Sequence, residues 1–252
     1  MTLRVLHITD THLFATPHAR HHDLDTEATL EGVLGAAAAL AWDLVLVTGD
    51  LVHDGSPSGY RRLADHLGVL GVPALCIPGN HDDPDALAAA LPRGALAWRG
   101  RHEVAPWTLL MLDSHLPGAV GGELGAAELR RLAAELAVGT GPVLIALHHP
   151  PVAVGSPWMD ADGLRDAAAF WRVVNESRRV RGILWGHIHQ AFDTIRGGIR
   201  LMASPSTGLQ FLPHSADFAL DDRRPGYRSL LLGSDGIIDS EVLRLPRGPG
   251  SS

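Results

Sequence analysis

A short buried strand that ends in a carboxylate constrains this chain more than any other feature. Within residues 43–54, DLVLVTGDLVHD, the run Leu44–Val47 has the length and β-branched content of a strand covered on both faces. Gly49 and Asp50 follow at its carboxyl end, where open α/β sheets place their ligands. The segment therefore predicts a strand that delivers Asp50 to a functional edge, with Gly49 allowing close approach of backbone or ligand.

Polar blocks follow four further apolar runs in the same way. They pair Asp10 with His12, Asn80 with His81, His148 with His149, and His187 with His189. Because the carboxyl ends of parallel strands meet at one edge, we expect these side chains to converge. Nitrogen and oxygen ligands without a thiolate favour a two-metal centre, and Asp50 is the candidate for its bridging carboxylate.

Composition restricts the class of partner. The 252 residues are 46% hydrophobic and 19% charged, which is typical of a globular protein with a sizeable core. The net charge is −7, and the 21 basic residues are all arginine and form no basic run. Since binding a nucleic-acid polymer needs a concentrated positive surface, we predict none as partner. The single cysteine, Cys76, falls in a predicted strand and is interpreted as a core thiol.

Targeting features are missing from the sequence. No charged and apolar leader precedes the strand that begins at Leu3, and no apolar run reaches 18 residues. We therefore predict a cytoplasmic protein without a membrane segment. With no repeat or linker, residues 1–246 are expected to form a single domain, followed by a disordered tail over residues 247–252.

Strands and helices alternate through most of the chain, as in β-α-β units. Strands are predicted at Leu3–Ile8, Leu44–Val47, Ala74–Ile77, Thr108–Leu112, Pro142–Leu147 and Arg181–Trp185. Helices are predicted from Thr26 to Trp42, from Ser56 or Ser58 to about Leu70, after Pro84, from Ala126 to Leu136 and over 166–178. Residues 191–245 predict antiparallel strands that meander and complete a second sheet.

Four loops near the polar blocks have both a functional and a plain structural interpretation. They are loop 14–23 with His18, His21 and His22, the pair His53 and Asp54, loop 152–163 with Trp158, Met159 and Asp160, and residues 204–207. In the first interpretation they line the mouth of the site or orient its ligands; in the second they are solvated or packing loops. Asp82 is interpreted as the group that fixes the tautomer of His81.

In order, the blocks Asp-x-His, Gly-Asp, Gly-Asn-His-Asp, His and Gly-His-x-His resemble the signature of calcineurin-like metallophosphoesterases over nearly the whole chain. The resemblance implies an α/β fold, a four-layer α/β/β/α sandwich of two mixed sheets flanked by helices. It also implies two metal ions, Fe and/or Mn with Zn as the alternative. One ion would be held by Asp10, His12, Asp50 and His189, and the other by Asp50, Asn80, His148 and His187.

The same resemblance implies a mechanism. Asp50 and a hydroxide would bridge the two ions, and the hydroxide would attack a phosphodiester in line. His81 would protonate the leaving oxygen or stabilise the transition state. The residues implied to contact the substrate phosphate are His12, Asp50, Asn80, His81 and His189.

Segments 148–152, 155–160, 205–207 and 225–228 further resemble bacterial class III cyclic nucleotide phosphodiesterases, which hydrolyse 3′,5′-cyclic AMP to AMP. One departure is Asp166, where such sequences often have Asn and where a negative charge can alter substrate choice. The predicted partner is thus a small phosphodiester, most simply cyclic AMP. The alternatives are a glycerophosphodiesterase or other small-diester hydrolase, and a binding module without turnover. The C-terminal antiparallel strands are the candidate surface for a homodimer.

Overall fold

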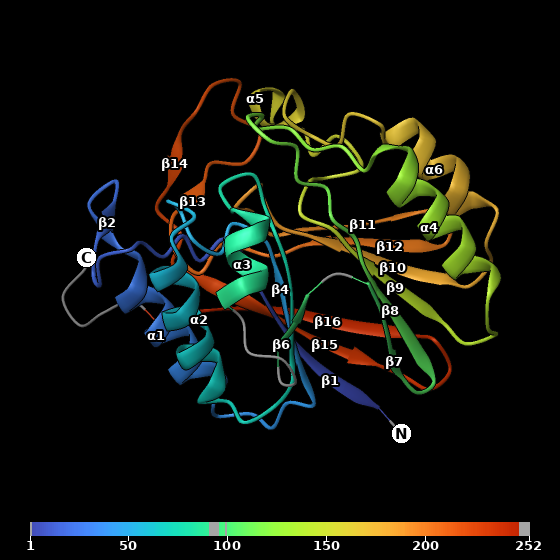
Figure 1. Ribbon diagram of the computed structural model, residues 1–252, viewed down its shortest axis with the longest axis horizontal. Helices are drawn as coiled ribbons and strands as arrows, with labels where there is room; N and C mark the ends of the chain where they lie inside the picture. The colour runs from blue at the N-terminus through green and yellow to red at the C-terminus, as the bar shows by residue number, and fades with distance from the viewer. Residues whose placement is uncertain (1, 91–95, 99, 247–252) are drawn as a thin grey trace.

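Two six-stranded sheets form the centre of the protein, a computed structural model that describes residues 2–90, 96–98 and 100–246 (Figure 1). The first sheet has the order β16 (Ile238–Arg244), β15 (Gly226–Leu232), β1 (Leu3–Ile8), β4 (Leu44–Thr48), β5 (Ala74–Ile77) and β6 (Leu96–Trp98). The second has the order β11 (Phe192–Arg196), β12 (Ile199–Ala203), β10 (Val180–Trp185), β9 (Val143–Ala146), β8 (Trp107–Met111) and β7 (Gly100–Val104).

Helices lie on both outer faces of this pair of sheets (Figure 1). The first sheet is covered by α1 (Thr26–Ala37), α2 (Pro57–Gly68) and α3 (Pro84–Ala90), and the second by α4 (Gly125–Ala137) and α6 (Ala167–Asn175). The short elements are α5 (Pro157–Asp160) and two ribbons, β2 (Arg20–His21) with β3 (Leu24–Asp25) and β13 (Gln210–Phe211) with β14 (Leu220–Asp221). The four-layer α/β/β/α sandwich of two mixed sheets is confirmed.

Strand β4 shows why its sequence is apolar without alternation. Leu44 and Leu46 enter the core between the two sheets, whereas Val45 and Val47 pack into the core under α1 and α2. Successive side chains of a strand point to opposite faces, so a strand covered on both sides needs apolar residues at every position. This placement leaves the polar residues after β4 at the end of the sheet.

The parallel strands explain how distant segments meet. Strands β1, β4 and β5 run parallel in the first sheet, and β8, β9, β10 and β12 run parallel in the second. Their shared core joins the two sheets. One domain over residues 1–246 stays a prediction. The polar blocks of both sheets therefore lie at one end of the sandwich, as the sequence predicted.

The C-terminal region departs from its prediction. Residues 191–245 were expected to complete a second sheet, but β11 and β12 join the second sheet while β15 and β16 join the first. Strand β15 pairs antiparallel with β1, from Leu3 opposite Leu232 to His7 opposite Arg228. The edge of β1 lies far away in sequence, and a local pattern cannot identify it.

Helix α1 also ends earlier than predicted. Its start is confirmed, because the Asp25 side chain caps it by accepting the backbone N–H of Ala28. It ends at Ala37, not at Trp42, and the Trp42 indole donates a 2.8 Å hydrogen bond to the Ala37 carbonyl.

In the described part of the chain, no helix is long and apolar enough to cross a membrane. The predicted tail 247–252 lies outside the described residues.

Candidate active site

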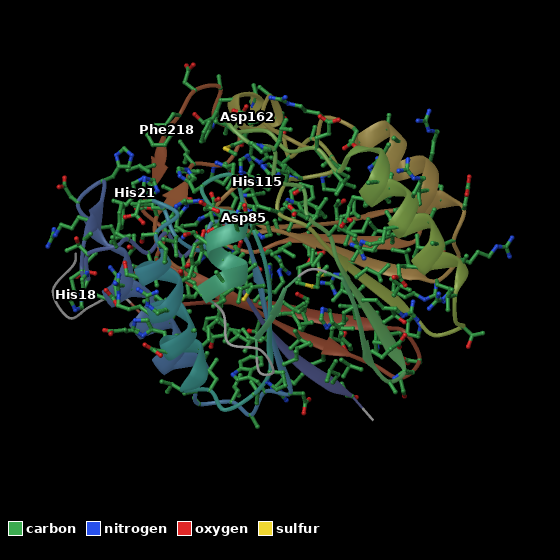
Figure 2. The ribbon with its side chains drawn as sticks, viewed as in Figure 1. His18, His21, Asp85, His115, Asp162 and Phe218 are labelled. Carbon is green, nitrogen blue, oxygen red and sulfur yellow. The ribbon has the colours of Figure 1, made fainter. Side chains whose placement is uncertain are left out.

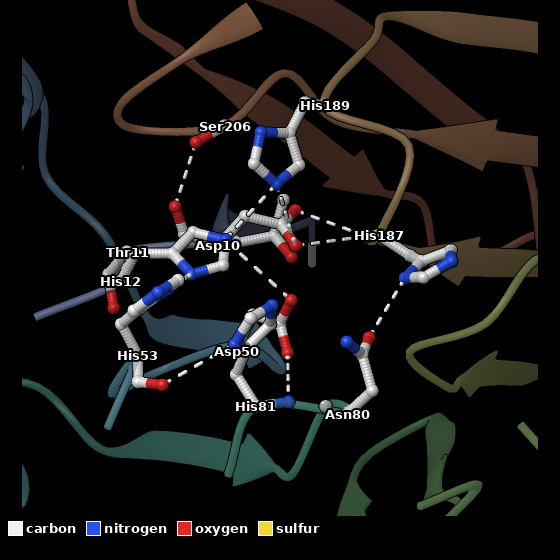
Figure 3. Close-up of polar contacts among 12 residues, drawn as sticks. Asp10, Thr11, His12, Asp50, His53, Asn80, His81, His187, His189 and Ser206 are labelled. Carbon is white, nitrogen blue, oxygen red and sulfur yellow. Dashed lines mark hydrogen bonds and ion pairs between the residues drawn. The ribbon is translucent and has the colours of Figure 1, made fainter. Parts of the chain in front are cut away.

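Seven polar side chains from the strand ends lie close together, and Figure 3 labels all of them except His148. Five of them line one pocket, whereas Asp10 and His148 are fully buried beside it. We call this group the polar floor, and it consists of Asp10, His12, Asp50, Asn80, His148, His187 and His189. All seven residues that the sequence put forward as metal ligands are thus brought together.

Asp50 lies between two groups of histidines. Its Oδ2 atom is 3.6 Å from His12 Nε2, and its Oδ1 atom is 3.5 Å from His148 Nε2. The backbone N–H of His81 donates to Oδ1 at 3.0 Å and fixes the orientation of the carboxylate (Figure 3). Asp50 therefore presents one oxygen to each group, which is the geometry that a bridging carboxylate needs.

The group around His148 contains several hydrogen-bond acceptors. His148 Nδ1 donates to the Thr48 carbonyl at 2.7 Å, so in the neutral ring Nε2 carries a lone pair. That atom lies 3.2 Å from Asn80 Oδ1, which is itself 3.0 Å from His187 Nδ1. Among the described residues, the other His187 nitrogen is buried without a partner. Nitrogen and oxygen atoms with free lone pairs that face one another in this way suit a bound cation.

The group around His12 has the same character. His189 Nδ1 donates to the Leu209 carbonyl at 2.9 Å, which leaves the Nε2 lone pair directed at His12 Nε2, 3.2 Å away. Asp10 Oδ1 lies 3.6 Å from the same His189 atom. Burial lowers the pKa of His189 to about 3, so its imidazole is neutral and available as a ligand.

The pKa values in the floor indicate that its carboxylates need a proton or another positive charge beside them. Burial raises the pKa of Asp10 to about 8, although the neighbouring His148 opposes this. Burial disfavours the charged form of His148, but Asp50 and then Asp10 outweigh it and raise the pKa of His148 to about 9. The buried carboxylates therefore require positive charge beside them, and metal ions in the two groups would supply it and displace the protons.

The backbone of the floor is held in a conformation that costs free energy. Left-handed φ angles occur at Asp10 (54°), His12 (44°), Asp50 (49°), His187 (67°) and His189 (49°). Non-glycine residues with such angles cluster at functional sites, where the surrounding structure holds them in place. At Gly79, an added Cβ would collide with Asp50 Oδ1 and His148 Nε2, so only glycine fits there.

His149 differs from its neighbour His148, although both follow β9. Its Nδ1 is 2.8 Å from the Ser114 hydroxyl, and its Nε2 donates to the Val120 carbonyl at 3.0 Å. Both ring nitrogens are therefore used by the protein itself. His149 holds the loop that carries Val120 against the pocket, and His148 is the one free to bind a ligand.

Asp82 does not have the role predicted for it. Its carboxylate accepts the backbone N–H groups of Leu51, Val52 and Gly79 at 2.8–3.1 Å, and the Tyr60 hydroxyl at 2.9 Å. These donors occupy the carboxylate and stabilise the turn after Asp50. His81 Nδ1 lies instead 3.4 Å from the carbonyl oxygen of His53 (Figure 3).

The upper part of the pocket is formed by loops, and we call it the rim. It consists of His21, His22, Val120, Trp158, Met159, Asp162, Phe211 and Phe218. The sequence offered loops 14–23 and 152–163 as candidates, and both contribute. Figure 2 shows Phe218 and Asp162 near the top of the molecule with His21 below them, whereas His18 lies farther out and pairs with Asp25.

The two phenylalanines of the rim had no signal in the sequence, unlike Trp158. Phe211 stacks on His189 of the floor, with ring centroids 4.1 Å apart and planes 5° apart. Phe218 is half exposed, and the centroid of its ring lies 5.7 Å from that of His22. Trp158 packs edge to face against Phe218. Both phenylalanines belong to the region after β12, whose path along the pocket depends on long-range contacts.

The remaining candidate residues have structural contacts. Asp54 accepts the Ala15 backbone N–H, and Asp160 accepts those of Val154 and Gly155. Asp166 accepts backbone N–H groups at the start of α4 and does not line the pocket, so an effect of its charge on substrate choice finds no support. In loop 204–207, the Ser206 hydroxyl donates to the Asp10 carbonyl at 2.7 Å and so supports the floor (Figure 3).

Known proteins are similar to this chain in sequence and in fold. The 3′,5′-cyclic adenosine monophosphate phosphodiesterase CpdA of Vibrio vulnificus is 39% identical over 251 residues, 98% of this chain and 92% of its own length. The CpdA of Escherichia coli K12 is 38% identical over 247 residues, 96% and 90% of the two chains. A dimetal phosphatase from Danio rerio shares the fold, with a TM-score of 0.62 at 15% identity over 97% of this chain and 99% of that one. The family model for calcineurin-like phosphoesterases matches residues 3–191, and the chain belongs to that family.

Proposed function

We propose that this chain is a dinuclear-metal phosphodiesterase that hydrolyses 3′,5′-cyclic AMP to AMP. The choice of 3′,5′-cyclic AMP as the substrate rests on one observation. The chain is similar over almost its full length to relatives named as 3′,5′-cyclic AMP phosphodiesterases. Proteins of the family bind two metal ions, and this chain has clusters of Asp and His that suit them. A cytoplasmic location and a homodimer stay predictions.

In this proposal the floor divides into two ligand sets that share Asp50. Asp10, His12, Asp50 and His189 hold one ion, and Asp50, Asn80, His148 and His187 hold the other. The acceptor atoms that face one another across 3.0–3.6 Å support both sets. Oxygen and imidazole ligands suit Fe and Mn, with Zn as the alternative. When bound, the ions supply electrophilic stabilisation of the phosphoryl group and an activated water.

The protein groups do the rest of the chemistry. His12, Asp50, Asn80, His81 and His189 surround the place of the phosphate. His81 Nδ1 donates to the His53 carbonyl, which leaves Nε2 for the leaving oxygen. In the imidazolium form Nε2 carries the second ring proton, and giving it to the leaving oxygen returns the ring to its neutral Nδ1–H tautomer. The aromatic rim then gives the nucleobase a surface on which to stack.

A second candidate follows from the same rim. Aromatic faces beside a carboxylate also bind quaternary ammonium groups, and Trp158 and Phe218 line the pocket together with Asp162. Glycerophosphocholine carries such a group and is a small phosphodiester. The rim therefore admits a glycerophosphodiesterase as the alternative activity.

The test is a comparison of kcat/KM for four diesters with metal-free protein reloaded with Mn²⁺ or Fe²⁺. The substrates are 3′,5′-cyclic AMP, 2′,3′-cyclic AMP, glycerophosphocholine and bis(p-nitrophenyl) phosphate. We expect 3′,5′-cyclic AMP to be the best natural substrate and AMP its product. Preference for glycerophosphocholine would support the second candidate. No turnover with two ions bound would leave only a binding module.

A further inference from the structure

His53 contacts His12 and His81, and its ring also lies beside that of His21 in the rim, with centroids 4.5 Å apart. His53 belongs to neither proposed ligand set. Its Nδ1 atom lies 3.1 Å from His12 Nδ1, and its ring stacks on that of His81 with centroids 4.4 Å apart and planes 22° apart. It reaches both because it follows Asp50 by three residues in a loop whose backbone pairs with the segment after His12.

In the contact with His12, the position of the shared proton can be assigned. His12 Nε2 faces His189 and Asp50, so this nitrogen must carry a lone pair if it binds a cation. The proton of the neutral His12 ring is then on Nδ1, and the nearest acceptor is His53 Nδ1. A metal-binding histidine commonly donates its other N–H to a carboxylate, carbonyl or water, which fixes the ring and raises its basicity. Here an imidazole takes that place.

The contact with His81 is of a different kind. The His53 carbonyl accepts from His81 Nδ1 at 3.4 Å, while the two rings lie nearly parallel. The carbonyl selects the tautomer, and the stacked ring limits rotation of the His81 side chain. Replacing the His53 side chain would remove the second restraint and leave the first.

We propose that His53 is a positioning residue that orients both His12, as an acceptor, and His81, as a stacking surface. A third metal ion held by His12, His53 and His81 is the competing explanation, because their nitrogens lie within 4.8 Å of one another. Nearly parallel rings disfavour it, since ligand nitrogens direct their lone pairs in the ring plane and those of His53 and His81 do not converge on one point.

Three substitutions separate the two contacts. His53→Asn keeps an acceptor near the position of Nδ1 but removes the ring, His53→Phe keeps a ring but removes the acceptor, and His53→Ala removes both. His115→Asn is the matched control, because His115 is a partly buried histidine outside the pocket. Thermal unfolding of each variant checks that it folds.

The first readout is metal affinity, measured by chelator competition without substrate. We expect His53→Phe and His53→Ala to bind one of the two ions about 10-fold more weakly, at the lower end of the 10–100-fold range for loss of such partners. His53→Asn and the His115 control should bind like the wild type. Equal affinity in all variants would contradict the role as an acceptor.

The second readout is the dependence of kcat on the leaving group, over aryl methyl phosphates from p-nitrophenyl to phenyl. A poorly held proton donor matters most for poor leaving groups, so His53→Asn and His53→Ala should show a steeper dependence than the wild type, and His53→Phe should not. The same slope in all variants would contradict the stacking role. A third bound ion in the wild type, lost in every His53 variant, would overturn the proposal.

The inference rests on the proposed phosphodiesterase, but it can fail separately. Chelator competition needs no turnover, and the aryl diesters test His53 even if cyclic AMP is not hydrolysed. Failure with cyclic AMP alone would therefore count against the proposed substrate, whereas wild-type behaviour of His53→Ala in both readouts would count against the role of His53.

Discussion

The floor and the rim of the pocket are built in different ways. Floor residues lie at the ends of central strands, and all but the partly buried Asn80 are almost fully buried. They are held by hydrogen bonds such as those that His148 and His189 donate to the Thr48 and Leu209 carbonyls. Rim residues come from four separate segments outside the central strands and include the half-exposed Phe218. The difference indicates that the fold fixes the chemistry, while loops that can change without disturbing the sheets select the substrate.

Asp50→Asn should give the largest effect, because it removes the charge shared by both halves of the floor. We expect fewer than two ions per chain and a loss in kcat of roughly 10³-fold, equivalent to about 4 kcal/mol. Metal analysis and hydrolysis of bis(p-nitrophenyl) phosphate measure both quantities. Full activity with two bound ions would show that Asp50 bridges nothing.

The pair His148→Ala and His149→Ala tests whether only the histidine in the floor binds metal, although the two residues are adjacent. His148→Ala should lose one ion and roughly 10²-fold in activity, because a proposed ligand is gone. His149→Ala should keep both ions, because its nitrogens bond to Ser114 and Val120. The comparison breaks down if the two variants lose the same amount of metal.

Phe218→Ala should affect the substrate and not the chemistry. Loss of one stacking surface is worth about 1–3 kcal/mol, so KM for 3′,5′-cyclic AMP should rise by about 5- to 150-fold with little change in kcat. Bis(p-nitrophenyl) phosphate should be less affected because it lacks the base. Leu220→Ala is the control, since Leu220 is also exposed but does not line the pocket. An equal loss of kcat with both substrates would place Phe218 in the chemistry.

The smallest effect concerns His7, which lies beneath the floor. Burial, and then the charge of Arg228, lowers its pKa well below the ordinary value, and its ring bonds to the Thr48 and Ser204 hydroxyls. The unfolded chain takes up a proton near pH 6.5 that the folded protein does not, so stability falls as the pH is lowered. This contributes about 1 kcal/mol between pH 7 and pH 5.5, as urea unfolding can measure. His7→Gln should make the decline shallower, and an unchanged slope would contradict the assignment.

The sequence could predict the floor because its residues sit in short blocks directly after strands. For Asp10, Asp50 and His187, the preceding apolar run predicts a strand and so places the residue at its carboxyl end. The adjacent glycine or neighbouring polar residue then marks it as a candidate ligand. The four-layer fold was implied by the resemblance to the family, and the strands agree with it, since apolar residues at every position of β4 require cover on both faces.

The rim and the C-terminal strands could not be predicted in the same way. Phe211 and Phe218 reach the pocket through contacts with His189 and His22, which no local pattern encodes. Strand β15 pairs with the distant β1 and not with a neighbour in the second sheet. Asp82 was misassigned because two of its backbone donors, Leu51 and Val52, come from the turn after Asp50, about 30 residues earlier in the chain.

The most direct test of the central claim is anomalous diffraction from crystals of the Mn²⁺-loaded protein. The account predicts two peaks about 3.5–4 Å apart, one on each side of the Asp50 carboxylate. The first should be bounded by Asp10, His12 and His189, and the second by Asn80, His148 and His187. A single peak, or two peaks that do not share Asp50, would contradict it.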